Sequence, residues 1–196
     1  MHALAAKLQL QQPYLVGHDL GGIVTYAYVR RFGDSLRGAM ILDVPMPGIA
    51  GWDDAVKGAW HIGFIQTPGL AEKVVPGRQQ AWLGYFLDFG KFTPAERSYY
   101  FRAYDAPQLH AAFEIYRGFP QDGKFNAAQT TSNATPLLVA VGEQSPFAAL
   151  LPTFVQGYRA KGMTRVESAH IPGAKHYVVA DNPQAVGDLI ERYAKP

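Results

Sequence analysis

One acidic residue of the chain stands where a nucleophile would be presented. Asp19 lies between Gly17 and Gly21, after a short apolar run at 14–16 and before a helical pattern at 23–32. Glycines at these positions remove Cβ atoms that would clash in a tight turn, and Asp tolerates left-handed backbone. This strand–turn–helix pattern favours a nucleophile elbow with Asp19 at its apex. The alternative is a glycine-flanked Asp that only caps the following helix.

A carboxylate at such an apex is suited to attack on an sp³ carbon. Asp is an anion at neutral pH, so opening an epoxide or displacing a halide needs no base in the first step. The product would be an alkyl ester on Asp19, which an activated water must hydrolyse. That second step calls for a histidine whose tautomer is fixed by an acid. The N-terminus of the following helix favours negative charge at the same apex.

The elements around this elbow predict an α/β fold. The predicted strands are 14–16, 39–42, 136–142 and, more weakly, 164–171. A terminal helix is expected from Pro183 to Ala194, with Asn182 as its N-cap. Because helical segments alternate with the strands, we expect a parallel sheet of about four strands.

The composition changes from Trp52 to about Pro120. Aromatic residues crowd this stretch, and it contains no alternating β-branched run. We therefore predict several helices that form a cap inserted into the sheet domain. The chain then divides into a first core part with the elbow at 1–51, a helical cap at 52–120 and a second core part at 121–196.

Composition narrows the function classes. The chain has 196 residues, 48% of them hydrophobic, a mean hydropathy of -0.09 and a net charge of +2. Such a small, scattered charge does not favour nucleic acid or an anionic membrane as partner. No apolar run is long enough to cross a bilayer, and residues 1–12 lack the features of a signal peptide, so we expect a cytoplasmic protein. The absence of cysteine excludes disulfides and thiolate metal sites.

The elbow around Asp19 resembles that of α/β-hydrolases of the epoxide hydrolase and haloalkane dehalogenase type, which attack carbon with an Asp. The resemblance runs from about Leu10 to the C-terminus and corresponds to the later part of such a protein. It implies a partial α/β-hydrolase sheet with a helical cap and no metal or organic cofactor. It also implies that the base is His176, which follows Gly173 and precedes Asn182 and Pro183 as the family pattern expects.

The other histidines have no such context. His18 is expected to pack under the elbow, and His2, His110 and His170 to be structural or exposed. The acid that orients His176 has two candidates, since family members place it after either of two strands. Asp43 directly follows the predicted strand 39–42. Glu143 lies one residue into the loop after 136–142, where Ser145 stands in place of the family's Asp; we favour Asp43.

The resemblance also assigns residues to substrate. Tyr116, within Ile115-Tyr116-Arg117, resembles the cap tyrosine that donates a hydrogen bond to an epoxide oxygen, and a phenol stays protonated near pH 7. His61, beside Trp60, stands where a second tyrosine is expected. Dehalogenases place a halide-binding Trp directly after the nucleophile, where this chain has Leu20. The alternative for Tyr116 and His61 is a helix–helix core contact.

The resemblance further implies about four strands before the elbow strand, and a His-Gly loop that supplies half of the oxyanion hole. Nothing before Tyr14 matches them; residues 1–12 predict a helix with Leu4 and Leu8 on one face. The elbow strand is then expected to be an open sheet edge, which is a template for pairing. A second copy in a homo-oligomer, or the N-terminal helix, would cover it, or the chain is a truncated piece.

Together these observations predict a hydrolase that opens a small apolar epoxide through an ester on Asp19. Tyr116, with His61, would protonate the ring oxygen, and His176, oriented by Asp43, would activate water. The backbone N–H of Leu20 would stabilise the oxyanion. Two alternatives remain: a haloalkane or haloacid dehalogenase with the same triad, and a truncated hydrolase with weak or no activity.

Overall fold

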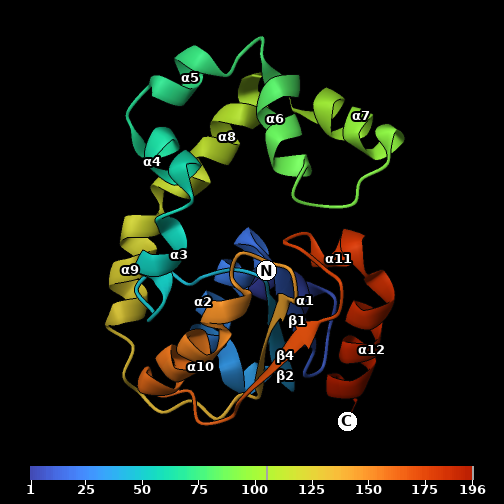
Figure 1. Cartoon of the computed structure of the whole chain (residues 1–196). Helices are drawn as coiled ribbons and strands as arrows, with labels where there is room; N and C mark the ends of the chain where they lie inside the picture. The colour runs from blue at the N-terminus through green and yellow to red at the C-terminus, as the bar shows by residue number, and fades with distance from the viewer. Residues whose placement is uncertain (105, 196) are drawn as a thin grey trace.

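The computed structural model describes residues 1–104 and 106–195; residues 105 and 196, which fall in the predicted cap and second core part, lie outside them. A parallel four-stranded sheet has the order β1-β2-β3-β4 and lies in the lower part of the molecule in Figure 1. The strands are β1 (Tyr14–His18), β2 (Gly38–Leu42), β3 (Leu137–Gly142) and β4 (Val166–Ile171). The predicted α/β fold, with a partial sheet of four strands, is confirmed.

Helices cover both faces of this sheet. One face carries α2 (Leu20–Phe32) and α10 (Leu151–Ala160), and the other carries α11 (Val178–Asp181) and α12 (Pro183–Tyr193). Side chains alternate along β2 and β3, so Ile41 and Val139 enter the first core whereas Met40 and Leu138 enter the second. Both strands are buried throughout, which explains their nearly continuous apolar sequences. Two short 3₁₀ segments, η1 (Gly33–Ser35) and η2 (Ala148–Leu150), precede β2 and α10.

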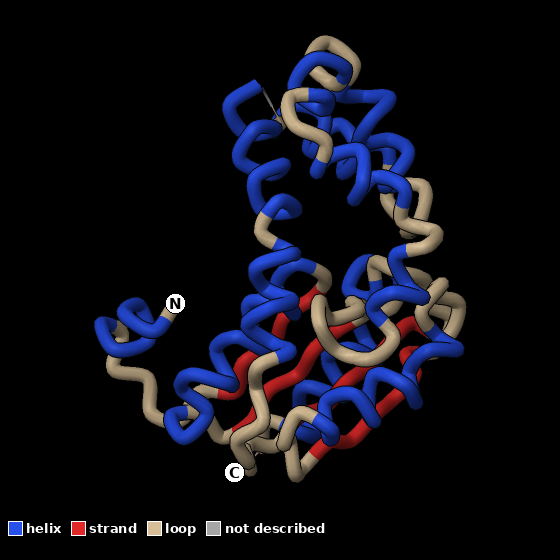
Figure 2. Tube along the Cα trace, turned by 90° about the vertical axis from the view of Figure 1, so that its left-hand side faces the viewer, coloured by secondary structure: helices blue, strands red, loops and turns tan. Residues whose placement is uncertain are grey.

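A set of helices inserted between β2 and β3 stands over the carboxyl ends of the strands (Figures 1 and 2). They are α3 (Trp52–Val56), α4 (Trp60–Gln66), α5 (Leu70–Val74), α6 (Gln79–Leu87), α7 (Pro94–Ala103), α8 (Ala106–Arg117) and α9 (Phe119–Ala127). Ile65, Leu109 and Phe113 anchor a small separate core within this cap. The last helix, α9, continues past the expected boundary at residue 120. Within the described residues, no helix combines the length and the apolar character needed to cross a membrane.

The N-terminal helix is shorter than predicted. Residues 1–12 were expected to be helical, but α1 covers only His2–Lys7, and Gln9 has a positive φ of 53°. None of its residues is buried, and Leu4 and Leu8 are each 58% exposed. A helix this short is marginal without packing of an apolar face. It contacts the end of α2, where His2 stacks on Phe32 with the ring centroids 4.1 Å apart.

The glycines of the elbow act differently from the prediction. Asp19 adopts φ 51° and ψ -126°, and a Cβ on Gly17 would collide with the backbone of Gly21, as expected. A Cβ on Gly21, however, would meet nothing within 4 Å. The second glycine that the fold requires is Gly22, whose Cβ would lie 2.6 Å from Val44 Cγ1. The prediction chose Gly21 from its spacing to Asp19 along the chain. The contact between Gly22 and Val44 forms only in the tertiary structure, which that spacing does not show.

These two neighbouring glycines provide a matched test of the elbow. We expect Gly22→Ala to destabilise the protein by about 1–3 kcal/mol through overpacking. Gly21→Ala adds a methyl group in open space on a helix and should stabilise it by about 0.5–1 kcal/mol. Urea unfolding of both variants measures the difference. Equal losses of stability in the two variants would contradict this description of the turn.

Candidate active site

The carboxylate of Asp19 is presented by backbone geometry. The Asp19 N–H donates to the Leu42 carbonyl oxygen at 3.0 Å, which ties the apex of the turn to the end of β2. Its side chain makes no capping hydrogen bond to α2, so the alternative of a simple helix cap is not what the structure has. Instead the side chain, 35% exposed, borders a cavity. Burial raises the pKa of Asp19, but the hydrogen bond to His176 and the positive charge beside it together outweigh burial and lower the pKa, so the group is ionised.

His176 lies between two carboxylates. Its Nδ1 is 2.8 Å from Asp43 Oδ2, and its Nε2 is 3.5 Å from Asp19 Oδ2. Burial lowers the pKa of His176, yet the two carboxylates together raise it to about 10. The loop that carries it is fixed by Asp181, whose carboxylate accepts the Lys175 N–H at 2.7 Å. The resting site is therefore an imidazolium paired with two carboxylates.

Asp43 is fully buried and has every partner that such a charge requires. It follows β2 in a left-handed conformation with φ 50°. Its Oδ1 accepts the Gly142 N–H at 2.7 Å, and its Oδ2 accepts the Ser145 hydroxyl at 2.9 Å as well as His176. Ser145, which stands where the family's alternative acid would, therefore supports Asp43. In the sequence, this supporting role of Ser145 was visible only as a turn at Gly142–Ser145 after the predicted strand.

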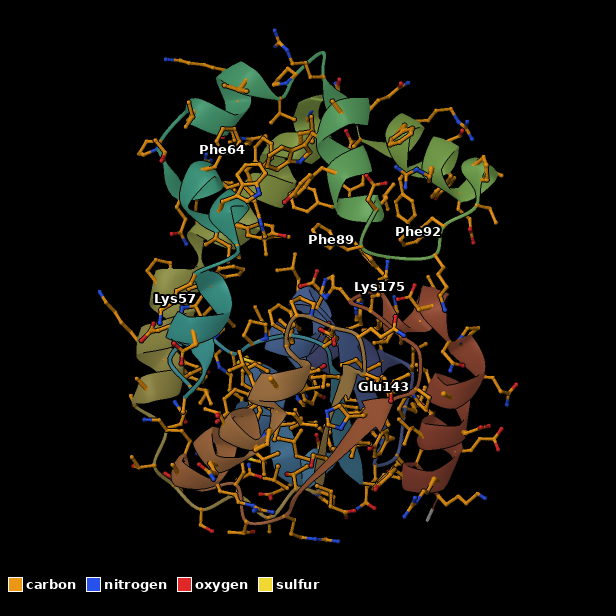
Figure 3. The ribbon with its side chains drawn as sticks, viewed as in Figure 1. Lys57, Phe64, Phe89, Phe92, Glu143 and Lys175 are labelled. Carbon is orange, nitrogen blue, oxygen red and sulfur yellow. The ribbon has the colours of Figure 1, made fainter. Side chains whose placement is uncertain are left out.

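Glu143 does not reach the imidazole. Its residue is exposed, and its carboxylate Oε2 accepts the Gly173 N–H at 2.9 Å. Figure 3 shows Glu143 on the core, below Lys175, and Phe89 and Phe92 in the cap. Of the two candidate acids, Asp43 therefore contacts His176, whereas Glu143 accepts a hydrogen bond from the backbone of the loop before His176.

The cavity above Asp19 lies between the cap and the core and has a volume of about 260 Å³. The predicted substrate residues all line it: Leu20, Trp60, His61 and Tyr116. The Trp60 indole N–H is already bonded to the Tyr85 hydroxyl at 3.0 Å. The cavity wall is dominated by apolar and aromatic side chains, with no lysine or arginine among the lining residues. Such a site is suited to a small uncharged molecule.

Two polar side chains of the cap face this cavity beside Asp19. The rings of His61 and Tyr116 pack edge to face, with centroids 5.7 Å apart. Burial, and then the Asp19 charge, raise the pKa of Tyr116, so its phenol keeps its proton. Burial lowers the pKa of His61, which makes it a neutral imidazole at neutral pH. A further lining residue, Tyr177, was not predicted, because an aromatic residue beside His176 forms no recognisable spacing.

A possible cation site on the cap is explained by ion pairing. Glu72, His110 and Glu114 place ligand atoms within 4.8 Å of one another. Arg117, however, binds the Glu72 carboxylate through two nitrogens at 2.6 and 2.9 Å and also pairs with Glu114. The hydrogen bonds from Arg117 lower the pKa of Glu72 to about 2. The guanidinium already neutralises these carboxylates, so the cluster indicates an ion-pair network.

The charge on His176 gives a test of which acid holds it. We expect its imidazole to titrate at about pH 10, and Asp43→Asn to lower that pKa because one favourable negative charge is lost. Glu143→Gln, which touches only Gly173 in this loop, should leave the pKa unchanged. NMR titration of the imidazole nitrogens measures all three proteins.

The raised pKa of His176 also makes the stability of the fold depend on pH. Because folding raises the pKa of His176 from 6.5, the charged imidazole stabilises the folded state. This stabilisation is fully present below about pH 6.5 and is lost as the pH rises through about 10. The free energy of unfolding should therefore fall less over that range in Asp43→Asn than in the wild-type protein. A His176 pKa that drops in Glu143→Gln but not in Asp43→Asn would contradict the assignment.

Comparisons with known proteins agree with this architecture. Residues 1–189 match the alpha/beta hydrolase family, and a search of curated proteins finds no match. The chain is similar to Cfl2 from Burkholderia cenocepacia, with a TM-score of 0.85 and 21% identity over 98% of this chain and 68% of that one. It is also similar to the epoxide hydrolase CorEH, with a TM-score of 0.84 and 22% identity over 98% and 71% of the two chains. These likenesses show the fold, and the family match shows that this chain belongs to the alpha/beta hydrolase family.

Proposed function

We propose that this hydrolase opens a small apolar epoxide to a diol through an ester on Asp19. The observation that carries the proposal is the Asp19–His176–Asp43 arrangement at the floor of a mainly apolar cavity that Tyr116 also lines. The similarity of the fold to the epoxide hydrolase CorEH supports the same reaction class. The cavity offers a nucleophile, a base and a phenolic acid, and no lysine or arginine among its lining residues could hold a carboxylate or phosphate.

In the first step, an Asp19 carboxylate oxygen attacks a ring carbon and forms the ester bond. The ring C–O bond breaks, and its electron pair remains on the oxygen, which takes the Tyr116 phenolic proton. His61 lies against Tyr116 and assists at the same oxygen. Once Asp19 is an ester it carries no charge, so His176 loses one of the two carboxylates that raise its pKa. The His176 imidazolium then protonates the Tyr116 phenolate and becomes a neutral base.

In the second step, His176 removes a proton from water as the water oxygen attacks the ester carbonyl carbon. Asp43 holds the imidazole through Nδ1, so that Nε2 faces Asp19. The backbone N–H of Leu20, in the first turn of α2, is a donor for the oxyanion. Collapse of the tetrahedral intermediate releases the diol with a proton from His176. The bond between the Asp19 carbonyl carbon and the alkyl oxygen breaks in this collapse and leaves Asp19 as a carboxylic acid. Its proton then moves to His176, which restores both the carboxylate and the imidazolium.

Displacement of a halide from the same Asp would use the same base. Against this alternative, Leu20 is apolar, and the Trp60 indole N–H already bonds Tyr85. Matched epoxide and halide substrates therefore distinguish the two reactions: diol formation without halide release is expected. The reverse result would assign the site to a dehalogenase.

The ester intermediate can be trapped. We expect His176→Gln to accumulate a covalent adduct on the peptide that contains Asp19, because the base for the second step is gone while the nucleophile remains. Asp19→Asn should form no adduct and should lose turnover by on the order of 10⁴–10⁶. Mass spectrometry after brief incubation with a panel of small epoxides detects the adduct. Adduct on another residue, or none with any epoxide or alkyl halide, would overturn the proposal.

A further inference from the structure

A tyrosine of the core shares the cavity with Tyr116, which belongs to the cap. Tyr177 directly follows His176 and lines the same cavity as Asp19. Its residue is half-buried, and its ring is fixed by edge-to-face packing on His176 and on Phe92, with centroids 4.9 Å away in both cases. Phe92 belongs to the cap segment that returns to the core between α6 and α7. The ring is thus held between the two parts of the molecule.

The hydroxyl of Tyr177 is available to a ligand. Among the described residues it has no hydrogen-bond partner, in contrast to Tyr85, whose hydroxyl is bonded to Trp60. Two other tyrosine hydroxyls, those of Tyr26 and Tyr158, are buried without a partner, but they lie in the sheet core. Tyr177 is not among these sealed groups, and it borders the cavity.

The Asp19 charge acts on Tyr116 and on Tyr177. Burial, and then the Asp19 charge, raise the pKa of Tyr177, just as they raise the pKa of Tyr116, and Tyr177 further raises the pKa of Tyr116. Two protonated phenols therefore lie near the carboxylate, one from α8 and one from the loop after β4. His61, by contrast, is enclosed by aromatic rings, those of Phe86 and Tyr116 among them, with centroids 5.0 and 5.7 Å away.

We propose that Tyr177 is a second catalytic hydroxyl, which donates a hydrogen bond to the epoxide oxygen together with Tyr116. This inference rests on the proposed function. One proton is transferred, from Tyr116, as the ring C–O bond breaks; Tyr177 keeps its proton and stabilises the negative charge that develops on the oxygen. The two phenols then hold the oxygen from the cap side and from the core side. Tyr177 thereby adds a donor from the core to Tyr116 and His61 of the cap.

Removal of one hydroxyl tests the inference. Tyr177→Phe keeps the ring packing on His176 and Phe92 but should slow ester formation at least about tenfold, the loss expected for one hydrogen bond to a developing charge. Hydrolysis of the ester, which does not involve the ring oxygen, should keep its rate. Single-turnover quench with mass spectrometry measures the two steps separately. Tyr116→Phe provides the comparison, and Tyr99→Phe is the control, because Tyr99 is 64% exposed and does not line the cavity.

Each outcome has one meaning. Slower ester formation with unchanged ester hydrolysis supports a catalytic hydroxyl. Equal slowing of both steps would show that Tyr177 only positions His176, and unchanged ester formation would show no role; either result overturns the inference and leaves the epoxide reaction in place if Tyr116→Phe is impaired. If the unmodified enzyme forms no ester with any epoxide, the proposed function itself fails.

Discussion

The pairing of one imidazole with two carboxylates is the constraint on which this structure depends. Buried charges are costly unless they are paired and hydrogen-bonded. Residues at the carboxyl ends of all four strands supply these charges and their hydrogen-bond partners. Asp19 follows β1, Asp43 follows β2, the Gly142 N–H ends β3, and His176 follows β4. The parallel order of the sheet is what makes four segments so distant in sequence meet within hydrogen-bond distance.

The cap completes the site and is tied to the same support. Asp181 accepts the Lys91 N–H of the cap at 2.6 Å through one oxygen and the Lys175 N–H of the base loop through the other. The cap segment near Phe92 and the position of His176 are therefore linked through one carboxylate. Above Asp19 the wall is aromatic and uncharged, which lowers the local dielectric and strengthens the electrostatic interactions within the cavity.

Residues that stand in a recognisable local pattern could be located from the sequence. Asp19 and His176 stand in recognisable turns, and Asp43 follows a buried strand, so the structure could be expected to bring them together at one sheet edge. Properties set by tertiary contacts could not be predicted in this way. The steric role of Gly22 depends on Val44, and α1 is short because its apolar side chains Leu4 and Leu8 stay largely exposed. Tyr177 could not be predicted as a lining residue, because its place in the cavity comes from the tertiary structure and not from its neighbours in the chain.

The central claim is that the oxygen added to the product passes through Asp19. A single turnover with excess enzyme in H₂¹⁸O distinguishes this route from direct attack of water on the epoxide. If the ester forms and water attacks its carbonyl carbon, the label enters the Asp19 carboxylate and the first diol carries oxygen from the protein. Mass spectrometry of the diol and of the Asp19 peptide reads both fates. Label in the first diol, with an unlabelled Asp19 peptide, would contradict the account.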